Sequence, residues 1–226
     1  MKYKAIIFDL DNTLVSHHEC ERQTLVYIFN ELRLEYKDEY QNSFREIESK
    51  LWADKAKGLA TLDDVVMGRW SIWADKIGIK IDPIEADRLF KIGLANSRAL
   101  IDGVTEVVTG LHEQGYILCV ATNGLKSLQA PRIADTEIGH LFTHIIASEE
   151  VGASKPEPQI FNEMLKRLNM ISSEVIMVGD SLKNDIAGAN GVGIASVWLN
   201  PDGVTNTKGI IPTFEIKNLN ELFEIV

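Results

Sequence analysis

The sequence lacks the features that would assign it to several specialised protein classes. Its 226 residues include only two cysteines, Cys20 and Cys119, which exclude a disulfide framework and favour reduced thiols. No apolar run approaches the roughly 20 residues needed to span a bilayer. The first apolar stretch stops at Asp9 without a small-residue cleavage site, so no signal peptide is expected. These absences predict a cytoplasmic protein with no membrane partner.

Basic residues are scarce relative to acidic ones. The chain has 23 Lys and Arg against 33 Asp and Glu, a formal net charge of −10 and a pI near 5.0. This balance argues against a nucleic-acid polymer or an anionic membrane as the partner. A small anionic substrate remains compatible with it, because a bound cation can override the overall field. The oligomeric state is not predicted by these features.

The stretch "AIIFDLDNTLV", residues 5–15, begins as a continuous apolar run that is typical of a strand covered on both faces. Asp9 and Asp11 follow it, and a buried unpaired carboxylate would cost several kcal/mol. Both acids are therefore expected where the strand leaves the sheet. Residues two apart in an extended chain point to one side, and two carboxylates so placed require a cation or the protonation of one of them.

Residues 16–98 show apolar positions spaced by three and four, as in amphipathic helices. Three sets recur in this region: Leu25, Phe29 and Leu32; Phe44, Ile47 and Leu51; and Leu62, Val66, Trp70, Trp73 and Ile77. The third set predicts the best-formed helix, and Thr61 and Asp64 precede it with capping-box spacing. Asp82 and Pro83 predict the start of another helix. The region is therefore predicted to be an inserted helical bundle.

After Gly103, short apolar strands alternate with helical segments. The predicted strands span residues 115–124, 144–152, 174–181 and 193–200. This alternation predicts an α/β fold with a doubly wound parallel sheet and helices on both faces. The predicted domains are an α/β core of residues 1–15 and 99–226 and a helical domain of residues 16–98.

Polar residues follow the later strands: Thr122, Asn123, Lys155, Asp180 and Asp185. The carboxyl ends of parallel strands share one rim of a sheet, so these residues are expected to meet the acids at positions 9 and 11. Several acids, one lysine and a hydroxyl together suit a cation and a phosphate group. Oxygen ligands favour Mg²⁺, with Asp9 and Asp180 as the expected protein ligands.

This set of side chains predicts phosphoryl transfer. A metal ion would keep one carboxylate ionised, so that Asp9 attacks phosphorus as a nucleophile. Thr122, Lys155 and backbone N–H groups would hold the transferring oxygens. Asp11 would then serve as the acid that protonates the leaving alcohol and later as the base that activates water.

The segments "DLDNTLV", "TNG", "SKPEPQIF" and "GDSLKND" resemble, in this order, the four motifs of the haloacid dehalogenase superfamily of aspartate-nucleophile phosphohydrolases. The inserted helices resemble the small helical (C1-type) cap of that superfamily, and the resemblance implies a Rossmann-like core. Three stretches resemble the pyrimidine 5'-nucleotidase branch: "LWADKAKGLATLDDVVMGRWSIWADKIG", "SEEVGASKPEPQIF" and "GIIPTFEIKNLNEL". The branch implies nucleoside 5'-monophosphates as substrates and a cap that closes over them.

The resemblance also implies a role for each matched residue. Asp9 becomes the aspartyl phosphate and Asp11 is the general acid and base. Phosphate binding falls to Thr122, Asn123 and Lys155. Mg²⁺ is held by Asp9, the backbone carbonyl of Asp11 and Asp180, while Asp185 acts as a further ligand or in the outer shell.

Other functions remain open at this point. A sugar-phosphate or phosphoglycolate phosphatase would use the same residues, and so would a phosphomutase. Dehalogenation uses an Asp nucleophile without a metal, and it has no use for an acid at Asp11 or a ligand at Asp180. A non-catalytic binding or regulatory protein would keep the fold without turnover.

Two groups of side chains outside the motifs invite a functional interpretation. His17 and His18 are adjacent, which is not the spacing of a helical metal site, so solvated positions or substrate contacts are expected. Trp52, Trp70 and Trp73 offer a surface for base stacking. Trp70 and Trp73 also fit the apolar stripe and are predicted to lie in the core of the helical domain, whereas Trp52 fits either role.

Overall fold

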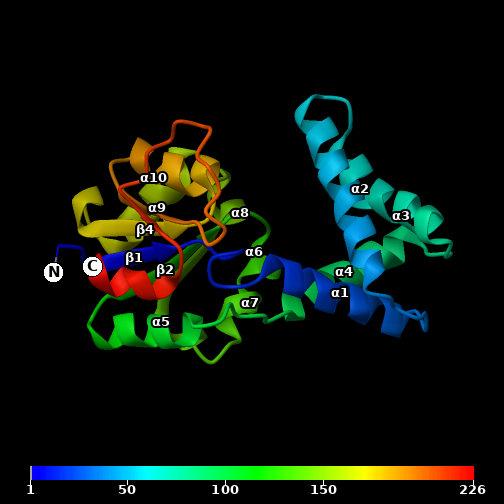
Figure 1. The fold of residues 1–226 in the computed structure, drawn as a ribbon, viewed down its shortest axis with the longest axis horizontal. Helices are drawn as coiled ribbons and strands as arrows, with labels where there is room; N and C mark the ends of the chain where they lie inside the picture. Colours follow the sequence, from blue (N-terminus) through cyan, green and yellow to red (C-terminus); the bar gives the residue numbers. More distant parts are fainter. Residues whose placement is uncertain (1) are drawn as a thin grey trace. The chain divides into compact units, whose positions relative to one another are not determined.

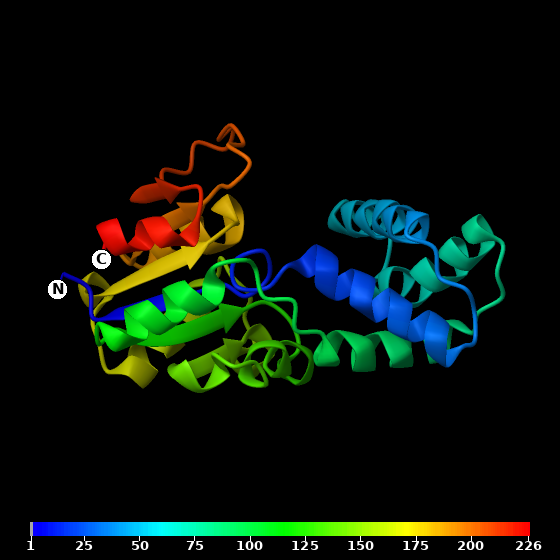
Figure 2. The same cartoon turned by 60° about the horizontal axis from the view of Figure 1, so that its bottom comes forward.

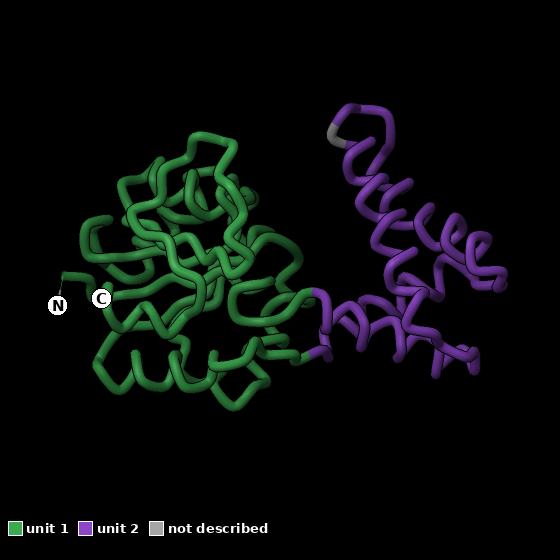
Figure 3. Tube along the Cα trace, in the orientation of Figure 1, with its two compact units in different colours: residues 1–17, 98–226 green, residues 18–97 purple. Residues whose placement is uncertain are grey.

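The computed structural model describes residues 2–226, except for the side chain of Ala56. The chain forms two compact units, one of residues 1–17 and 98–226 and the other of residues 18–97 (Figure 3). The first unit is the α/β core and the second is a helical unit. Among the described residues, no helix combines the length and the apolar character needed to cross a membrane.

The core contains one six-stranded sheet (Figures 1 and 2). Its strands are β1 (Ala5–Phe8), β2 (Ile117–Thr122), β3 (Phe142–Ala147), β4 (Val175–Gly179), β5 (Ala195–Leu199) and β6 (Phe214–Ile216). They lie in the order β3-β2-β1-β4-β5-β6 and every neighbouring pair is parallel. The predicted parallel α/β sheet is confirmed.

Helices cover both faces of this sheet (Figure 1). The core helices and turns are α5 (Val104–Glu113), α6 (Lys126–Gln129), α7 (Pro131–Ala134), η2 (Gly139–Leu141), α8 (Ser148–Val151), α9 (Pro158–Leu168), η3 (Ser172–Glu174), η4 (Leu182–Ile186), α10 (Ala187–Gly191) and η5 (Leu219–Glu224). Ile7 packs with Phe161 of α9 and Ala189 of α10 in one apolar cluster. Ile6 and Phe8 alternate with Ile7 and are also buried, so the central strand is apolar on both sides, as its sequence predicts.

The two connections to the helical unit leave the core side by side. Val15 and Leu100 form an isolated antiparallel bridge, and the N–H of Ser16 donates to the carbonyl of Ala99 at 2.8 Å. The N–H of Ile101 donates to the carbonyl of Leu14 at 3.0 Å. The chain therefore enters and exits the insertion through one short pair of hydrogen-bonded segments.

The helical unit is held together by an aromatic core. Its elements are α1 (His17–Glu31), α2 (Glu39–Ala56), η1 (Asp64–Gly68), α3 (Arg69–Ile77) and α4 (Pro83–Asn96). Phe44 packs against Trp70 and Trp73, with ring centroids 5.1 and 5.0 Å away. Both tryptophans are buried, which confirms their predicted place in the core, whereas Trp52 is 48% exposed.

The prediction that residues 62–77 form the most regular helix of this unit is wrong, because a π-helical turn interrupts them. Its capping box forms: Asp64 accepts from the N–H of Thr61 at 2.8 Å, and the hydroxyl of Thr61 accepts in return at 3.1 Å. The next turn, however, is the π-helical η1, and only nine residues follow in α3. The wider π turn buries Val65 in place of the expected Val66 and leaves Leu62 55% exposed.

The core also differs from the sequence-based prediction at two strands. The strand expected over residues 144–152 stops at Ala147, because Glu150 accepts from the N–H of Ala147 at 3.1 Å and the chain turns into α8. Gly152, in the left-handed conformation with φ 71°, ends that turn. The edge strand β6 was not predicted, since three residues carry too little alternation to identify a strand.

Candidate active site

The site lies at the carboxyl end of β1, where the strand order reverses. In doubly wound sheets this point is where ligands bind. A cavity of about 270 Å³ opens there. It is lined by Asp9, Asp11, Asn12, Thr122, Asn123, Lys155, Asp180, Ser181, Asn184 and Asp185. All seven residues selected from the sequence therefore line one cavity, although they come from four separate segments of the chain.

Lys155 lies at the centre of the charged groups. Its Nζ is 2.5 Å from Oδ1 of Asp9 and 2.7 Å from Oδ1 of Asp185, and it donates to the carbonyl of Ala121 at 2.7 Å. The side chain is only 2% exposed. Burial by itself would lower the pKa of Lys155, but the two carboxylates raise it above its ordinary value. The lysine is therefore held as a cation.

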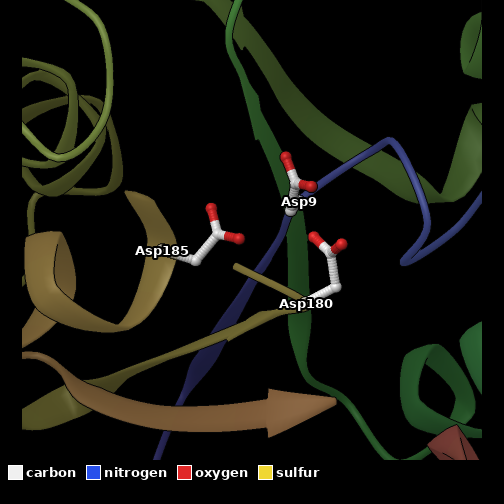
Figure 4. A group of neighbouring side chains, drawn as sticks. All are labelled: Asp9, Asp180 and Asp185. Atoms are coloured by element: carbon white, nitrogen blue, oxygen red, sulfur yellow. The ribbon is translucent and has the colours of Figure 1, made fainter. Parts of the chain in front are cut away.

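Two of these carboxylates form a cluster with a third, Asp180. Asp9, Asp180 and Asp185 each offer an oxygen, and these oxygens all lie within 4.8 Å of one another (Figure 4). Burial raises the pKa of Asp9 to about 8, and burial together with the charge of Asp185 raises the pKa of Asp180 to about 6. Three carboxylates and one lysine leave a charge of −2 when all are ionised, which fits a divalent cation with oxygen ligands.

Asp185 is held in place by contacts at the carboxyl end of β4. Its Oδ2 accepts from the N–H of Ser181 at 3.0 Å, while its Oδ1 faces Lys155. A Cβ atom added at Gly179 would lie only 2.4 Å from Oδ2 and 2.6 Å from the Cβ of Asp185. The absence of a side chain at Gly179 therefore permits the close approach of this carboxylate to the strand.

Asp11 has a different environment from the three converging carboxylates. Its Oδ1 is 2.6 Å from one Arg132 nitrogen, and its Oδ2 is 3.1 Å from the other. Nδ1 of His17 lies 3.3 Å from Oδ1. Burial would raise the pKa of Asp11, but hydrogen bonding to His17 and the charge of Arg132 hold it well below its ordinary range. Asp11 is thus an ionised carboxylate.

Asn123 holds the loop of Lys155 in place. Its Oδ1 accepts from the N–H of Lys155 at 2.8 Å, and its Nδ2 donates to the Lys155 carbonyl at 3.1 Å. Thr122 is buried beside it at the end of β2. The amide of Asn123 is therefore occupied by the backbone of Lys155, and Thr122 lines the cavity.

Several site residues were missed by the sequence-based reasoning. Arg132 and Gln129 contact Asp11 across 121 and 118 positions, and neither belongs to a recognisable motif. Asn12 also lines the cavity, and its left-handed backbone at φ 58° is typical of a turn. His17, expected in a solvated position or at the substrate, contacts Asp11. No signal in the single sequence distinguished Arg132 from an ordinary helical arginine.

Comparisons with known proteins agree with this geometry. The family model of the haloacid dehalogenase-like hydrolases matches residues 6–199. The HAD-hydrolase YfnB of Bacillus subtilis is 30% identical over all of this chain and 96% of its own length. Its magnesium-bound crystal structure superposes with a TM-score of 0.88 and covers 100% of this chain and 99% of that one.

Two further relatives carry a named activity. The pyrimidine 5'-nucleotidase YjjG of Escherichia coli is 29% identical and is aligned over 100% of this chain and 99% of its own length. The pyrimidine 5'-nucleotidase PynA of Streptococcus pneumoniae is 27% identical over 99% of this chain and 95% of its own. The similarity thus extends over both the core and the helical unit.

Proposed function

The chain belongs to the haloacid dehalogenase-like hydrolase family, and on that premise we propose that it is a Mg²⁺-dependent phosphatase of nucleoside 5'-monophosphates that forms an aspartyl phosphate on Asp9. The observation that carries the proposal is the cluster of Asp9, Asp180 and Asp185, whose oxygens lie within 4.8 Å of one another, with Lys155 paired to Asp9 and Asp185. The resulting charge of −2 favours a divalent cation, and the bound cation favours an anionic substrate.

The metal ligands in this proposal are Asp9, Asp180 and the backbone carbonyl of Asp11. Asp185 is assigned to the outer shell, because Lys155 and the N–H of Ser181 already occupy its two oxygens. When bound, Mg²⁺ offsets the negative charge of the carboxylates and of the phosphate oxygens. Asp9 and Asp185 are buried and accept hydrogen bonds from Lys155 and from the N–H of Ser181, so this part of the site is organised before the substrate arrives.

The residues of the chain divide the reaction between them. An oxygen of Asp9 attacks phosphorus as the bond to the leaving alcohol breaks. Asp11 is ionised in the substrate-free protein, so it must take up a proton, from solvent or from the water of the preceding turnover, before it can protonate this alcohol. Water then attacks the aspartyl phosphate, Asp11 takes its proton, and phosphate leaves Asp9. Lys155 and Thr122 hold the phosphate oxygens during both steps, and Asn123 keeps Lys155 in position.

The leaving group is proposed to be a nucleoside. A second cavity of about 440 Å³ shares Asn12 and Asp180 with the cavity of about 270 Å³ that holds the carboxylates. The rest of its lining is Ser16, Ile101, Trp198, Leu199, Asn200, Pro201, Asp202 and Val204. Among these described residues there is no lysine or arginine, so a second phosphate or a carboxylate would lack a partner there. Apolar walls with amide and hydroxyl groups suit a sugar and a base, and the relatives YjjG and PynA are named pyrimidine 5'-nucleotidases.

The test is phosphate release from purified protein with a panel of esters. Pyrimidine and purine nucleoside monophosphates are compared with sugar phosphates and phosphoglycolate, each with Mg²⁺ and with EDTA. Release is expected to need Mg²⁺, to disappear in Asp9→Asn, and to continue in Asp135→Asn, which removes an exposed acid outside the site. Release only from sugar phosphates or phosphoglycolate would overturn the nucleotide assignment.

Product analysis separates hydrolysis from the other functions of this fold. Phosphate moved to another hydroxyl of the substrate would identify a phosphomutase. If folded, Mg²⁺-loaded protein released phosphate from no ester, the catalytic proposal would fail in favour of a binding or regulatory role.

A further inference from the structure

We propose that Trp198 is a positioning residue that connects the cluster of Asp9, Asp180 and Asp185 with the cavity for the leaving group, an inference that rests on the proposed function. The indole N–H of Trp198 donates to the backbone carbonyl of Asp180 at 2.9 Å. The same side chain lines the cavity of about 440 Å³. Trp198 acts through the backbone that it holds and is therefore not a catalytic residue.

The first argument is the peptide unit between Asp180 and Ser181, which is held at both ends. Its carbonyl accepts the hydrogen bond from Trp198, and its N–H donates to Oδ2 of Asp185 at 3.0 Å. A peptide unit is planar, so its C=O and its N–H cannot rotate independently. The indole therefore fixes the plane that presents an N–H to Asp185, and it fixes the backbone from which the Asp180 side chain projects.

The second argument is the chain of contacts that begins at this peptide unit. Oδ1 of Asp185 lies 2.7 Å from Nζ of Lys155, and the same Nζ lies 2.5 Å from Oδ1 of Asp9. One peptide unit and two ion pairs thus connect Trp198 with the nucleophile of the proposed reaction. A rotation of the peptide unit would withdraw the backbone donor from Asp185 and free one of its two oxygens to move.

The third argument is that Trp198 is itself held firmly. It lies in β5, where it pairs with Gly179 of β4, and it is only 5% exposed. An indole N–H can only donate, and a buried one usually has an acceptor. Phenylalanine offers an aromatic ring without this donor. Trp198→Phe therefore removes the hydrogen bond to Asp180 and keeps most of the apolar packing.

The cavity beside the indole is bounded by an ordered turn. Oδ1 of the buried Asn200 accepts from the N–H of Val204 at 2.9 Å, and its Nδ2 donates to the carbonyl of Val204 at 3.1 Å and to Glu215 at 2.6 Å. These bonds close residues 200–204 into a turn that lines the cavity together with Trp198. A nucleoside in this cavity therefore meets a preformed wall, and any change that it causes at the indole reaches Asp180 through the hydrogen bond.

The test uses two binding measurements that need no turnover: calorimetric titration with Mg²⁺, and fluorine NMR of protein labelled with fluorotryptophan. The chain has four tryptophans, and single Trp-to-Phe variants assign their signals. We expect Trp198→Phe to bind Mg²⁺ about tenfold more weakly, as is typical when a group that orients a metal ligand is lost. The Trp198 signal should move when Mg²⁺ is added and move again when uridine is added to the Mg²⁺-loaded protein.

Trp73→Phe is the matched control. The indole N–H of Trp73 also donates to a backbone carbonyl, that of Tyr40 at 3.1 Å, and the ring is buried in the helical unit. Trp73→Phe should therefore lose a comparable hydrogen bond without a change in Mg²⁺ affinity. With a nucleoside monophosphate as substrate, Trp198→Phe should lose activity at low Mg²⁺ and recover most of it at saturating Mg²⁺, which a partly unfolded sample would not do.

An unchanged Mg²⁺ affinity in folded Trp198→Phe would overturn the positioning role, and so would a Trp198 signal that Mg²⁺ did not move. A signal that moved with Mg²⁺ but not with uridine would overturn the connection with the cavity. If the wild-type protein bound Mg²⁺ but released phosphate from no ester, the proposed function would fail. The Mg²⁺ titrations of the wild type and of Trp198→Phe would still decide whether Trp198 positions the carboxylates.

Discussion

Magnesium affinity should rise steeply with pH, because Asp9 must lose a proton before it binds the ion. Burial raises the pKa of Asp9 to about 8 in the metal-free protein. Each pH unit below that value costs about 1.4 kcal/mol, or a factor of about ten in affinity. The Mg²⁺ affinity should therefore be about tenfold weaker at pH 7 than at pH 9 and about 100-fold weaker at pH 6. Asp180, with its pKa raised to about 6, steepens the dependence below pH 6.

Isothermal titration calorimetry at pH 6, 7, 8 and 9 measures this dependence directly. Repeating the titrations at pH 7 in buffers with different ionisation enthalpies should reveal release of close to one proton per Mg²⁺ bound. Asp9→Asn should bind weakly and lose most of the dependence between pH 7 and 9, whereas the exposed-site control Asp135→Asn should retain it. An affinity that stays constant from pH 6 to pH 8 would refute the reasoning, because the nucleophile would then be ionised without the metal.

Three further predictions concern stability and packing. Without metal, in EDTA, the folded protein binds the proton of Asp9 more tightly than the unfolded chain does, because burial raises the pKa of Asp9 to about 8. The free energy of unfolding, measured with urea, should therefore fall as pH rises from about 4 to about 8. A rise in that free energy across the same pH range would contradict the prediction. Gly179→Ala should weaken Mg²⁺ binding at least about tenfold, because the added Cβ displaces Asp185. In the control Gly188→Ala the added Cβ would lie 2.4 Å from an aromatic ring of α9, so this variant should lose about 1–3 kcal/mol of stability without a change in Mg²⁺ binding. Phe44→Ala should destabilise the helical unit by about 3–5 kcal/mol and Trp52→Ala by less than about 1 kcal/mol, as thermal unfolding would show; similar losses would contradict the burial difference.

The site was largely predictable because it depends on strand ends. Asp9 directly follows β1, Thr122 ends β2 and Asp180 directly follows β4, and parallel strands bring these positions together whatever the loops between them do. Lys155 was also found, although it lies between α8 and α9, because its neighbours formed a recognisable motif. The sheet was predictable for the same reason, since continuous apolar runs identify buried strands.

The contacts of Arg132 and Gln129 with Asp11 were not predictable, because nothing local marks them. Arg132 and Gln129 lie in two helices of four residues each, and their partner Asp11 is more than a hundred positions away. The register of the helical unit was also missed, since a period of 3.6 does not reveal that the π turn η1 interrupts the stripe and buries Val65 in place of Val66. Long-range ion pairs and local changes of helical pitch are set by packing rather than by neighbouring residues.

The bridge between Val15 and Leu100 makes the helical unit an exchangeable module. The entropic cost of closing a loop depends on its length, but the pair of hydrogen-bonded segments already brings the two ends of this insertion together. Replacing residues 18–97 with a short linker should therefore leave the sheet, and the carboxylates at its rim, able to assemble. In evolutionary terms, such a junction permits one core to acquire different insertions and different substrates, because a change in the insertion leaves the chemistry of the core in place.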